Sequence, residues 1–429
     1  MISPFPSQDH DRLKLSLFAL MVVCLVDVMG QGIAFPIFDA LLLKPNSSFL
    51  AAGSPPGRGA FLYGVAIGTF FLTWFFGSIT ISRLSDSIGR RLGILVCLLG
   101  AIAGYGLAAA AIPLHSYPLL VASRAITGFT AGTQPIAAAA MIDLASNQQQ
   151  STRNLGLATV GVSIGLVIGP IIGGVFSDPA ILGGLASPQL PFVVGGILCL
   201  LALALVVLGF RDVVTERAPL QLSPLAIVRL FSDALERRSV LRISAVYFPY
   251  MLCFMAFYVF AAANLTARFG YGAQAASIGM VLLGAGLALA SGALVAPLNA
   301  RLSQRTIMVL VTVLLCAVIT AFLLVASGPL ALALLLPAGA LHGIGYPTLL
   351  GGYAQAADAD EQGWVMGFST ALFTLAAAIV SFLGGQLSAS GPAAPFQFAV
   401  LCGGVATLAA LLIWRRQPLS PLPQARERY

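Results

Sequence analysis

Long apolar stretches alternate with short polar connections along almost the whole chain. Each stretch is about 20 residues long, the length that an α-helix needs to cross a hydrocarbon core about 30 Å thick. The pattern therefore predicts an all-α integral membrane protein with twelve transmembrane helices. The expected spans cover approximately residues 14–36, 59–81, 92–112, 118–141, 154–176, 190–210, 240–264, 274–297, 306–326, 330–352, 364–387 and 395–414.

Composition supports the membrane assignment and narrows the range of functions. Hydrophobic residues make up 59% of the 429 residues and charged residues only 9%, whereas soluble domains carry about 25% charged residues. The net charge of +7 does not indicate a nucleic-acid partner, because the basic residues are dispersed between the apolar stretches. No phosphate-binding loop, metal-ligand cluster or catalytic-triad spacing occurs, so we expect no enzyme, no metal and no cofactor.

The basic residues instead predict how the chain lies in the membrane. If the N-terminus is cytoplasmic, the outer loops hold only Lys44, Arg58 and Arg268, and Arg124 lies within a span. That leaves 18 of the 22 Lys and Arg on the inner side. Both termini are therefore expected in the cytoplasm.

The longest polar connection follows the sixth span and divides the chain into two halves of six spans each. We expect one bundle in residues 1–210, a cytoplasmic loop in 211–239, a second bundle in 240–414 and a tail in 415–429. Similar residues recur between the halves at nearly constant offsets, as in transporters built from duplicated halves. Gly128 and Asp143 precede Gly343 and Asp358 by 215 positions, and Gly156, Gly173 and Gly174 precede Gly367, Gly384 and Gly385 by 211.

The fifth span is unusually rich in glycine. Gly165, Gly169 and Gly173 fall four apart, so on a helix they form one smooth stripe where a second backbone can approach closely. Pro170 removes a backbone donor and should bend or loosen the helix there. The alternative is a generic packing helix, because small residues at this spacing are common in membranes.

The same spacing carries a family resemblance. Gly156, Gly165, Gly169-Pro170 and Gly173-Gly174 match the pattern G-x8-G-x3-G-P-x2-G-G. This pattern resembles the fifth-helix antiporter motif of major facilitator superfamily exporters.

The connection after the second span resembles that family's signature loop, G-x-x-x-D-R-x-G-R-R. Here it reads Ser82-Arg-Leu-Ser-Asp-Ser-Ile-Gly-Arg-Arg91, with serine replacing the first glycine and the first arginine. Gly89 permits a tight turn, and Asp86 can accept hydrogen bonds at a helix start. We expect Arg90 and Arg91 to pair with Asp143 and so to latch a cytoplasmic gate. The alternative is a turn that only fixes topology.

Span four resembles the family motif l-x-x-x-R-x-x-q-G-x-g-a-a through Arg124 and Gly128, with Thr127 in place of glutamine. A guanidinium within a span is costly and usually faces a cavity or a partner. The resemblance implies that Arg124 takes part in proton coupling. Alternatively, Arg124 lies near the outer end of its span and could extend to the interface.

Span one contains Asp27, the only acid that we place well inside a span. Its distance to Pro36 fits the family's first-helix pattern, D-x8-P. An isolated carboxyl in apolar surroundings favours its protonated form, whereas an approaching cation, or Arg124, favours the carboxylate. Proton and substrate could therefore exchange at Asp27; alternatively, a neutral Asp27 only orients the helix.

Other candidates for the cavity are polar side chains and one aromatic series. Gln31 and Gln134 lie in spans one and four, and span seven combines aromatics such as Tyr258 with Asn264. Aromatics with few polar groups suit a hydrophobic ligand, although aromatics in membrane helices more often face lipid or packing partners. His342 in span ten could titrate near neutral pH, or could simply pack.

Taken together, the motifs resemble the major facilitator superfamily over nearly the whole chain. The resemblance implies two six-helix bundles that rock about a midplane site, and it is nearest to the bacterial drug:proton antiporters that include the tetracycline exporters. We therefore expect a monomeric carrier in the bacterial inner membrane that exports a small, largely hydrophobic compound in exchange for protons. A metabolite or siderophore carrier, exporting or importing, is the alternative. A receptor is disfavoured, because it would not need the gate and coupling motifs. A channel is disfavoured, because the two-half repeat and a Gly-Pro helix in one half only suit rocking better than a fixed pore.

Overall fold

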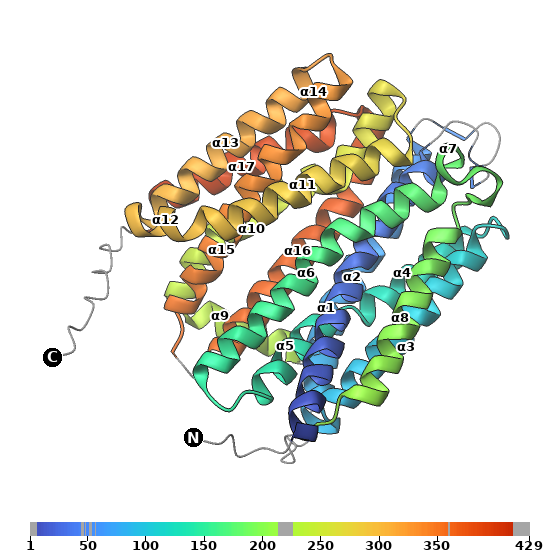
Figure 1. Ribbon diagram of the computed structural model, residues 1–429. Coiled ribbons are helices and arrows are strands. Elements are labelled where there is room, and N and C mark those ends of the chain that lie inside the picture. Colours follow the sequence, from blue (N-terminus) through green and yellow to red (C-terminus); the bar gives the residue numbers. More distant parts are fainter. Residues whose placement is uncertain are drawn as a thin grey trace.

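The computed structural model describes residues 7–43, 47, 49–50, 54–55, 57–212, 226–358 and 361–414 (Figure 1). In these ranges all the regular secondary structure is helical, and there is no strand. The helices are α1 (Ser7–Leu42), α2 (Arg58–Ile88), α3 (Arg90–Ala111), α4 (Tyr117–Phe129), α5 (Thr133–Asp143), α6 (Gln148–Ser177), α7 (Pro179–Leu182), α8 (Leu190–Gly209), α9 (Ala226–Glu236), α10 (Arg238–Phe269), α11 (Ala273–Ala293), α12 (Val295–Arg301), α13 (Gln304–Leu324), α14 (Gly328–Ala333), α15 (Leu335–Gln355), α16 (Gln362–Leu387) and α17 (Ala394–Leu412), with 3-10 turns η1 (Gly183–Leu185) and η2 (Ser388–Ser390).

Eleven of the described helical segments are long and apolar enough to cross a membrane. The remaining expected span, the fourth (118–141), is not one helix but two, α4 and α5, which are separated by a short break after Phe129. Gly132 in the break has φ +126°, a conformation that glycine adopts readily and other residues do not. Counting α4 and α5 as one crossing gives the predicted twelve-helix fold.

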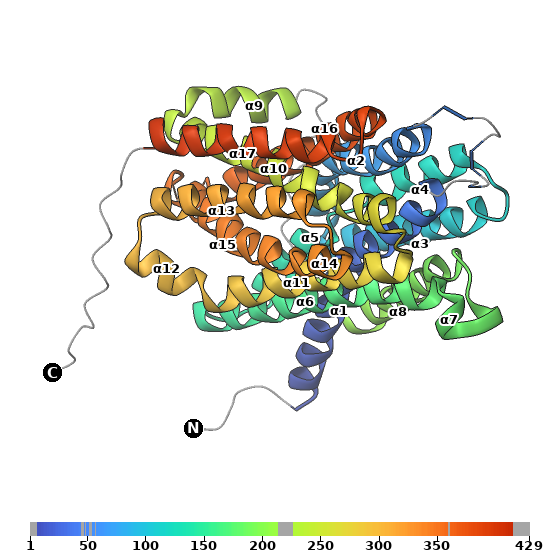
Figure 2. The same ribbon diagram turned by 90° about the horizontal axis from the view of Figure 1, so that it is seen from above.

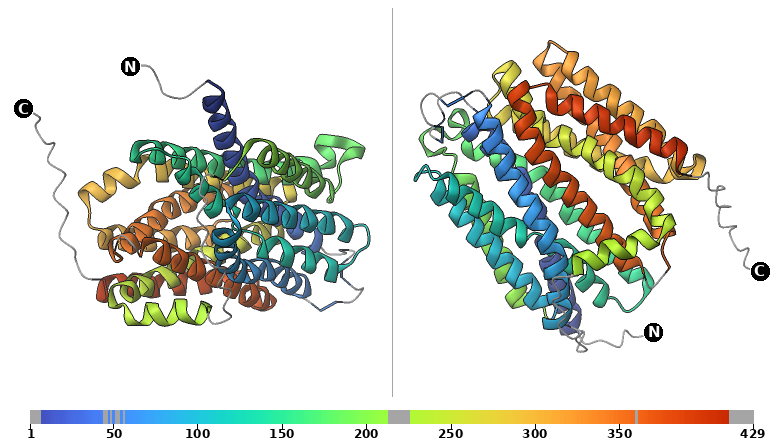
Figure 3. Two further views of the ribbon diagram at one scale, coloured as in Figure 1. Left: turned by 90° about the horizontal axis from the view of Figure 1, so that it is seen from below. Right: turned by 180° about the vertical axis from the view of Figure 1, so that it is seen from behind.

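The two halves pack on each other through equivalent helices. The second helix of the first half, α2, packs on the fifth helix of the second half, α16 (Figure 3, right). Reciprocally, the second helix of the second half, α11, packs on the fifth helix of the first half, α6. This exchange of helix pairs is what a pseudo-twofold relation between duplicated halves requires.

The glycine pairs at the ends of α6 and α16 show the same relation at the level of single contacts. A side chain at Gly173 would meet Ile33 of α1, and one at Gly384 would meet Phe260 of α10, so each contacts the first helix of its own half. A side chain at Gly174 would instead meet Ser277 of α11. Likewise, Gly385 faces Ala60 and Gly64 of α2, again the second helix of the opposite half. Glycines that recur in the sequence of the two halves therefore contact equivalent helices in the structure.

One end of the bundle is where α1 begins and α17 ends, and we call it the proximal end; α7 and α14 mark the opposite, distal end (Figure 1). Helix α9 lies at the edge of the bundle near the proximal end (Figures 1 and 2). The ring of its Phe231 contacts Phe75 of the first half and Phe368 of the second, with ring centroids 6.3 and 5.4 Å apart, respectively. The expected loop 211–239 thus contains a helix that bridges the halves. Residues 213–225 and the expected tail, 415–429, lie outside the described residues, and the proposed domain boundaries stay a prediction.

Candidate functional site

Helix α6 packs its glycine stripe directly on the backbone of α1. A side chain at Gly165 would meet the Leu25 carbonyl oxygen, and one at Gly169 would meet that of Met29. Gly161 continues the stripe one turn earlier, against Met21. The predicted close approach is confirmed, and its partner is the helix that carries Asp27, which the sequence did not reveal.

Two other members of the fifth-helix motif behave differently from the stripe. Gly156 faces open space, with no atom within 4 Å of where a side chain would begin. Pro170 lies within a continuous α6 and fills the space in front of Gly32, so a side chain at Gly32 would collide with its ring. The close packing of α1 and α6 is therefore made by the stripe and Pro170, without Gly156.

Asp27 lies on the face of α1 that points away from the glycine stripe. Its Oδ2 accepts a 3.1 Å hydrogen bond from the backbone N–H of Gln134, and Thr133 and Gly132 also bond to this carboxyl. These three residues form the start of α5, where backbone N–H groups lack partners within the helix. Asp27 therefore caps α5 from a neighbouring helix, and its carboxyl lies at the positive end of the α5 dipole.

This cap explains why the fourth span breaks. A helix start within the membrane needs an acceptor for its free N–H groups, since lipid provides none. Asp27 supplies that acceptor, while Gly132 provides the backbone conformation. The sequence showed both residues but not their proximity, because they are more than 100 positions apart.

The face of α1 that carries Asp27 continues through Gln31 and Phe35, each one turn further along. The Phe35 ring meets Tyr258 of α10 edge-on, with ring centroids 5.1 Å apart. Tyr258 stacks in turn on Phe254, at 5.9 Å. Asp27 and Gln31 thus share their face of α1 with an aromatic contact to the second half.

The aromatic series of span seven extends to His342. The imidazole of His342 on α15 stacks on Phe254, and its Nδ1 lies 3.0 Å from the Tyr250 hydroxyl. His342 is only 5% exposed. His342 is therefore packed and hydrogen-bonded in the interior, as in the packing interpretation that the sequence allowed.

The remaining cavity candidates are not all brought together. Gln134 contacts Asp27 through its backbone, and its side chain is exposed. Gln31 is partly exposed one turn from Asp27. Asn264 lies elsewhere, near the distal end, where its amide nitrogen donates to the Pro392 carbonyl at 2.9 Å. Asn264 is therefore removed from the group around Asp27.

Arg124 is enclosed by aromatic rings. Its guanidinium lies over Phe38 of α1, at 5.2 Å, and over Phe192 of α8, at 5.8 Å. The residue is 2% exposed, so it does not extend to the interface. Among the described residues, its Nη2 has no hydrogen-bond partner and no ion pair joins it to Asp27. Phe38 is about 16 Å from Asp27 along α1, at 1.5 Å per residue.

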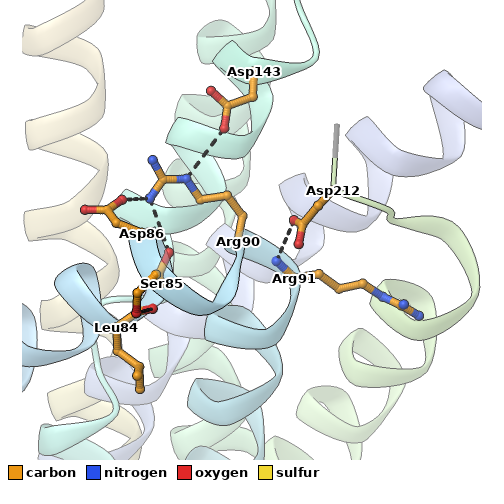
Figure 4. A network of polar contacts seen from close by, with 8 residues as sticks. Leu84, Ser85, Asp86, Arg90, Arg91, Asp143 and Asp212 are labelled. Carbon is orange, nitrogen blue, oxygen red and sulfur yellow. Dashed lines mark hydrogen bonds and ion pairs between the residues drawn. The ribbon is translucent and has the colours of Figure 1, made fainter. Parts of the chain in front are cut away.

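The signature loop forms a compact network at the proximal end (Figure 4). Gly89, at φ +105°, makes the turn between α2 and α3. Arg90 pairs with Asp86, and its Nε lies 3.5 Å from Asp143 Oδ2 at the end of α5. The predicted pairing with Asp143 is thus observed for Arg90.

Arg91 takes different partners from those expected. Its backbone N–H donates to Asp212 at 2.8 Å, and its guanidinium donates to the Val207 carbonyl at 2.6 Å. Both partners lie at the end of α8, so Arg91 ties α3 to α8. All the partners of Arg90 and Arg91 described here belong to the first half or, for Asp212, to the segment directly after it.

The second half has its own ion pair at this end. Arg237, which precedes α10, lies 2.6 Å from Glu361 at the start of α16. The guanidinium also lies 4.2 Å above the ring of Trp364. This ion pair ties the start of α16 to the segment that precedes α10.

One acid of α1 was missed entirely. Asp39 lies beyond the predicted span 14–36, but α1 continues to Leu42 and buries it. Its Oδ2 accepts a 2.6 Å hydrogen bond from the Thr266 hydroxyl of α10. The predicted span ended at residue 36, so Asp39 fell outside it, whereas the helix continues through Pro36.

Two six-helix halves, paired through equivalent helices and carrying a membrane-embedded acid, define a polytopic membrane carrier. The sequence matches the family model described as Major Facilitator Superfamily over residues 17–380. The chain belongs to this family and is a transporter, not an enzyme.

Known relatives agree with this assignment. The chain is 29% identical to the class D tetracycline resistance protein of Salmonella ordonez over 83% of this chain and 85% of that protein. Its fold is similar to the human organic anion transporter MFSD10, with a TM-score of 0.68, 21% identity, and coverage of 94% and 99% of the two chains. It is also similar to a D-xylose-proton symporter, with a TM-score of 0.69, 16% identity, and coverage of 94% and 98%.

Proposed function

We propose that this transporter exports a small, largely hydrophobic compound in exchange for protons, with the proximal end in the cytoplasm of a bacterial cell. The observation that carries the proposal is the placement of Asp27. Its carboxyl is held by the start of α5 in the first half, and its face of α1 leads to the Phe35–Tyr258 contact with the second. A group at this position can respond both to a ligand and to the relative movement of the halves.

The chemistry of Asp27 suits proton exchange. Backbone N–H groups at the start of α5 favour the charged carboxylate, whereas the apolar surroundings favour the protonated acid. Two opposing effects therefore act on the proton of this carboxyl. A substrate that binds beside Asp27 would change these surroundings and release the proton, and a proton arriving from the other side would restore the acid.

The aromatic side chains point to the substrate class. Phe35, Tyr258 and Phe254 provide apolar ring surface next to the Asp27 face, and Gln31 adds a polar group. Planar, largely hydrophobic compounds with few polar groups fit such surroundings. The resistance protein of Salmonella ordonez is named for tetracycline, which supports testing tetracyclines first.

Movement would follow from the contacts between halves. The α2–α16 and α6–α11 pairs provide two equivalent interfaces about which the halves can rock. The glycine stripe of α6 keeps α1, and thus Asp27, fixed to the first half during that movement. Under this proposal each proton moved inward by a membrane potential of 100 mV contributes about 2.3 kcal/mol.

Transport in proteoliposomes tests the proposal. The vesicles would contain an internal pH dye, with an imposed proton gradient and a panel of tetracyclines, lipophilic cations, organic anions and siderophores. We expect substrate-dependent proton flux in the wild type and its loss in Asp27→Asn, which keeps an oxygen to accept the Gln134 bond. Asp233→Asn, an exposed acid of α9, is the matched control.

The possible results separate the candidate functions. Flux that is unchanged in Asp27→Asn would move coupling to another residue. Equilibration of a substrate without proton flux would identify a uniporter and contradict antiport. Proton and substrate moving in the same direction would identify uptake, as in the alternative of a metabolite or siderophore importer.

A further inference from the structure

A cavity of about 620 Å³ lies at the distal end, between the two halves and apart from Asp27. The first half contributes Gly57, Arg58 and Ala60 at the start of α2, and the second half contributes residues that include Phe260 and Asn264 of α10. Its volume lies within the range of roughly 300–1,000 Å³ that is typical of small-molecule sites. Along α1, Asp39 at this end is about 18 Å from Asp27, at 1.5 Å per residue.

Contacts that join the halves surround this cavity. Thr266, which lines it, donates its hydroxyl to Asp39 across the interface. About two turns further along α10 into the bundle, the Tyr63 hydroxyl of α2 donates to the Val259 carbonyl at 2.9 Å. Because both halves supply its walls, the cavity exists in this form only while the distal end is closed.

The walls are mostly apolar and carry one cation. The polar atoms of Asn264 are already occupied, by the Pro392 carbonyl and by Arg268. Arg58 is exposed, and no ion pair joins it to a carboxylate in the described part of the chain. Its guanidinium lies 5.5 Å from the Phe61 ring, a contact that leaves its N–H groups able to donate. An apolar chamber with one available cation selects an amphipathic anion.

We propose that this cavity binds an amphipathic organic anion of the aromatic carboxylate class. The bound anion holds the distal end closed. The ring system would lie against the apolar walls, including Phe260 and Phe396, with the carboxylate toward Arg58. A ligand that contacts both halves in one state binds that state more tightly and so shifts the population toward it. The site would therefore act as an inhibitory site, reached from the distal side and distinct from the transport site.

Binding of 2-naphthoate to the full-length protein in lipid nanodiscs, measured by equilibrium dialysis, tests the site. The neutral 2-naphthalenemethanol serves as the matched ligand, and protein-free nanodiscs correct for partition into lipid. Arg58→Gln removes the cation, and Ala267→Phe fills the chamber from an exposed position on α10. Arg301→Gln, an exposed arginine of α12, is the control for charge alone.

We expect the wild type and Arg301→Gln to bind naphthoate equally. Arg58→Gln should weaken binding by roughly fivefold, as loss of a partly exposed charge-assisted contact implies. Ala267→Phe should weaken binding of both ligands, and Asp27→Asn should leave it unchanged, so the result is independent of proton coupling. Equal affinity in wild type, Arg58→Gln and Ala267→Phe, or equal binding of the neutral alcohol, would overturn the proposal.

A distance measurement tests the conformational effect. Spin labels at Leu114 and Ser390, both exposed near the distal end, report the separation of the halves, with Cys316 replaced by serine. Naphthoate should increase the population at the short distance, and Arg58→Gln should require a correspondingly higher concentration for the same shift. An unchanged distribution at saturating naphthoate, or a shift toward the long distance, would contradict closure by the ligand.

Discussion

The Thr266 hydroxyl donates a 2.6 Å hydrogen bond to the Asp39 carboxylate, and this bond joins α10 of the second half to α1 of the first. The network at the proximal end differs, because Arg90 contacts Asp86 and Asp143 within one half. The distal side is thus closed by direct polar contact between the halves. The signature loop instead braces α2, α3 and α5 against one another.

Removing the donor should open the distal end. Thr266→Val keeps the shape of the side chain but leaves Asp39 without this bond, which is worth about 1.5 kcal/mol when the acceptor is charged. We expect the population of the distal-open state to rise by roughly tenfold, the equivalent of that energy. Spin-label distances between Leu114 and Ser390 would measure it, with Thr320→Val, a threonine on exposed α13 surface, as control. A distribution identical to wild type would show that this bond does not hold the gate.

The glycine stripe makes a prediction with an internal control. Gly165→Ala places a methyl group against the Leu25 carbonyl, so α1 and α6 must separate. Overpacking of this kind costs about 1–3 kcal/mol, and the thermal unfolding midpoint followed by circular dichroism should fall. Gly156→Ala faces open space and should leave the midpoint unchanged or raise it, since alanine favours helix over glycine. Equal destabilisation by both substitutions would contradict the assignment of the stripe.

The helix pattern, the repeat and the glycine stripe could be predicted because they depend on local periodicity. Apolar length identified the spans, and spacing by four placed Gly165 and Gly169 on one face. The partner of that face could not be predicted, because periodicity says which side packs and not what packs on it. The pairing of α6 with α1 became visible only in three dimensions.

The candidate site was predicted less completely, for a related reason. Asp27 was identified by its burial in an apolar run, but its role as the cap of α5 depends on a break that Gly132 allows and a distant carboxylate stabilises. Asp39 was missed because the predicted span ended at residue 36. In a packed membrane bundle, neighbouring helices compensate for a proline, so α1 continues past Pro36. Boundaries set by tertiary contacts are not contained in local sequence.

Substitution of Arg124 should affect folding stability and proton flux differently. A buried guanidinium that lacks a carboxylate partner costs solvation energy, and replacing it with an apolar side chain of similar length often stabilises the fold. Arg124→Met should therefore keep or raise the thermal unfolding midpoint while reducing substrate-dependent proton flux at least tenfold. Arg301→Met, at an exposed arginine of α12, is the control. A lower midpoint with flux lost in proportion to folded protein would make Arg124 a structural residue held by Phe38 and Phe192.

The Arg90–Asp143 contact should contribute little to stability. Each side chain is 27% exposed and the closest atoms are 3.5 Å apart, so a coupling energy of about 0.5–1 kcal/mol is expected. A double-mutant cycle of Arg90→Gln and Asp143→Asn, followed by thermal unfolding, measures it. The pair Asp11 and Lys14, whose side chains are 80% and 65% exposed, should give no measurable coupling.

Transport by the same variants shows whether the Arg90–Asp143 contact breaks during the transport cycle or persists through it. If the contact breaks during the cycle, either single substitution should change the substrate-dependent flux several-fold, and the double variant should be no worse than the single ones. Such non-additivity is the signature of residues that act together. If flux falls only as much as the unfolding midpoint does, Arg90 and Asp143 hold α3 to α5 throughout the cycle. The gate would then depend on contacts between the halves, such as those of Phe231 with Phe75 and Phe368.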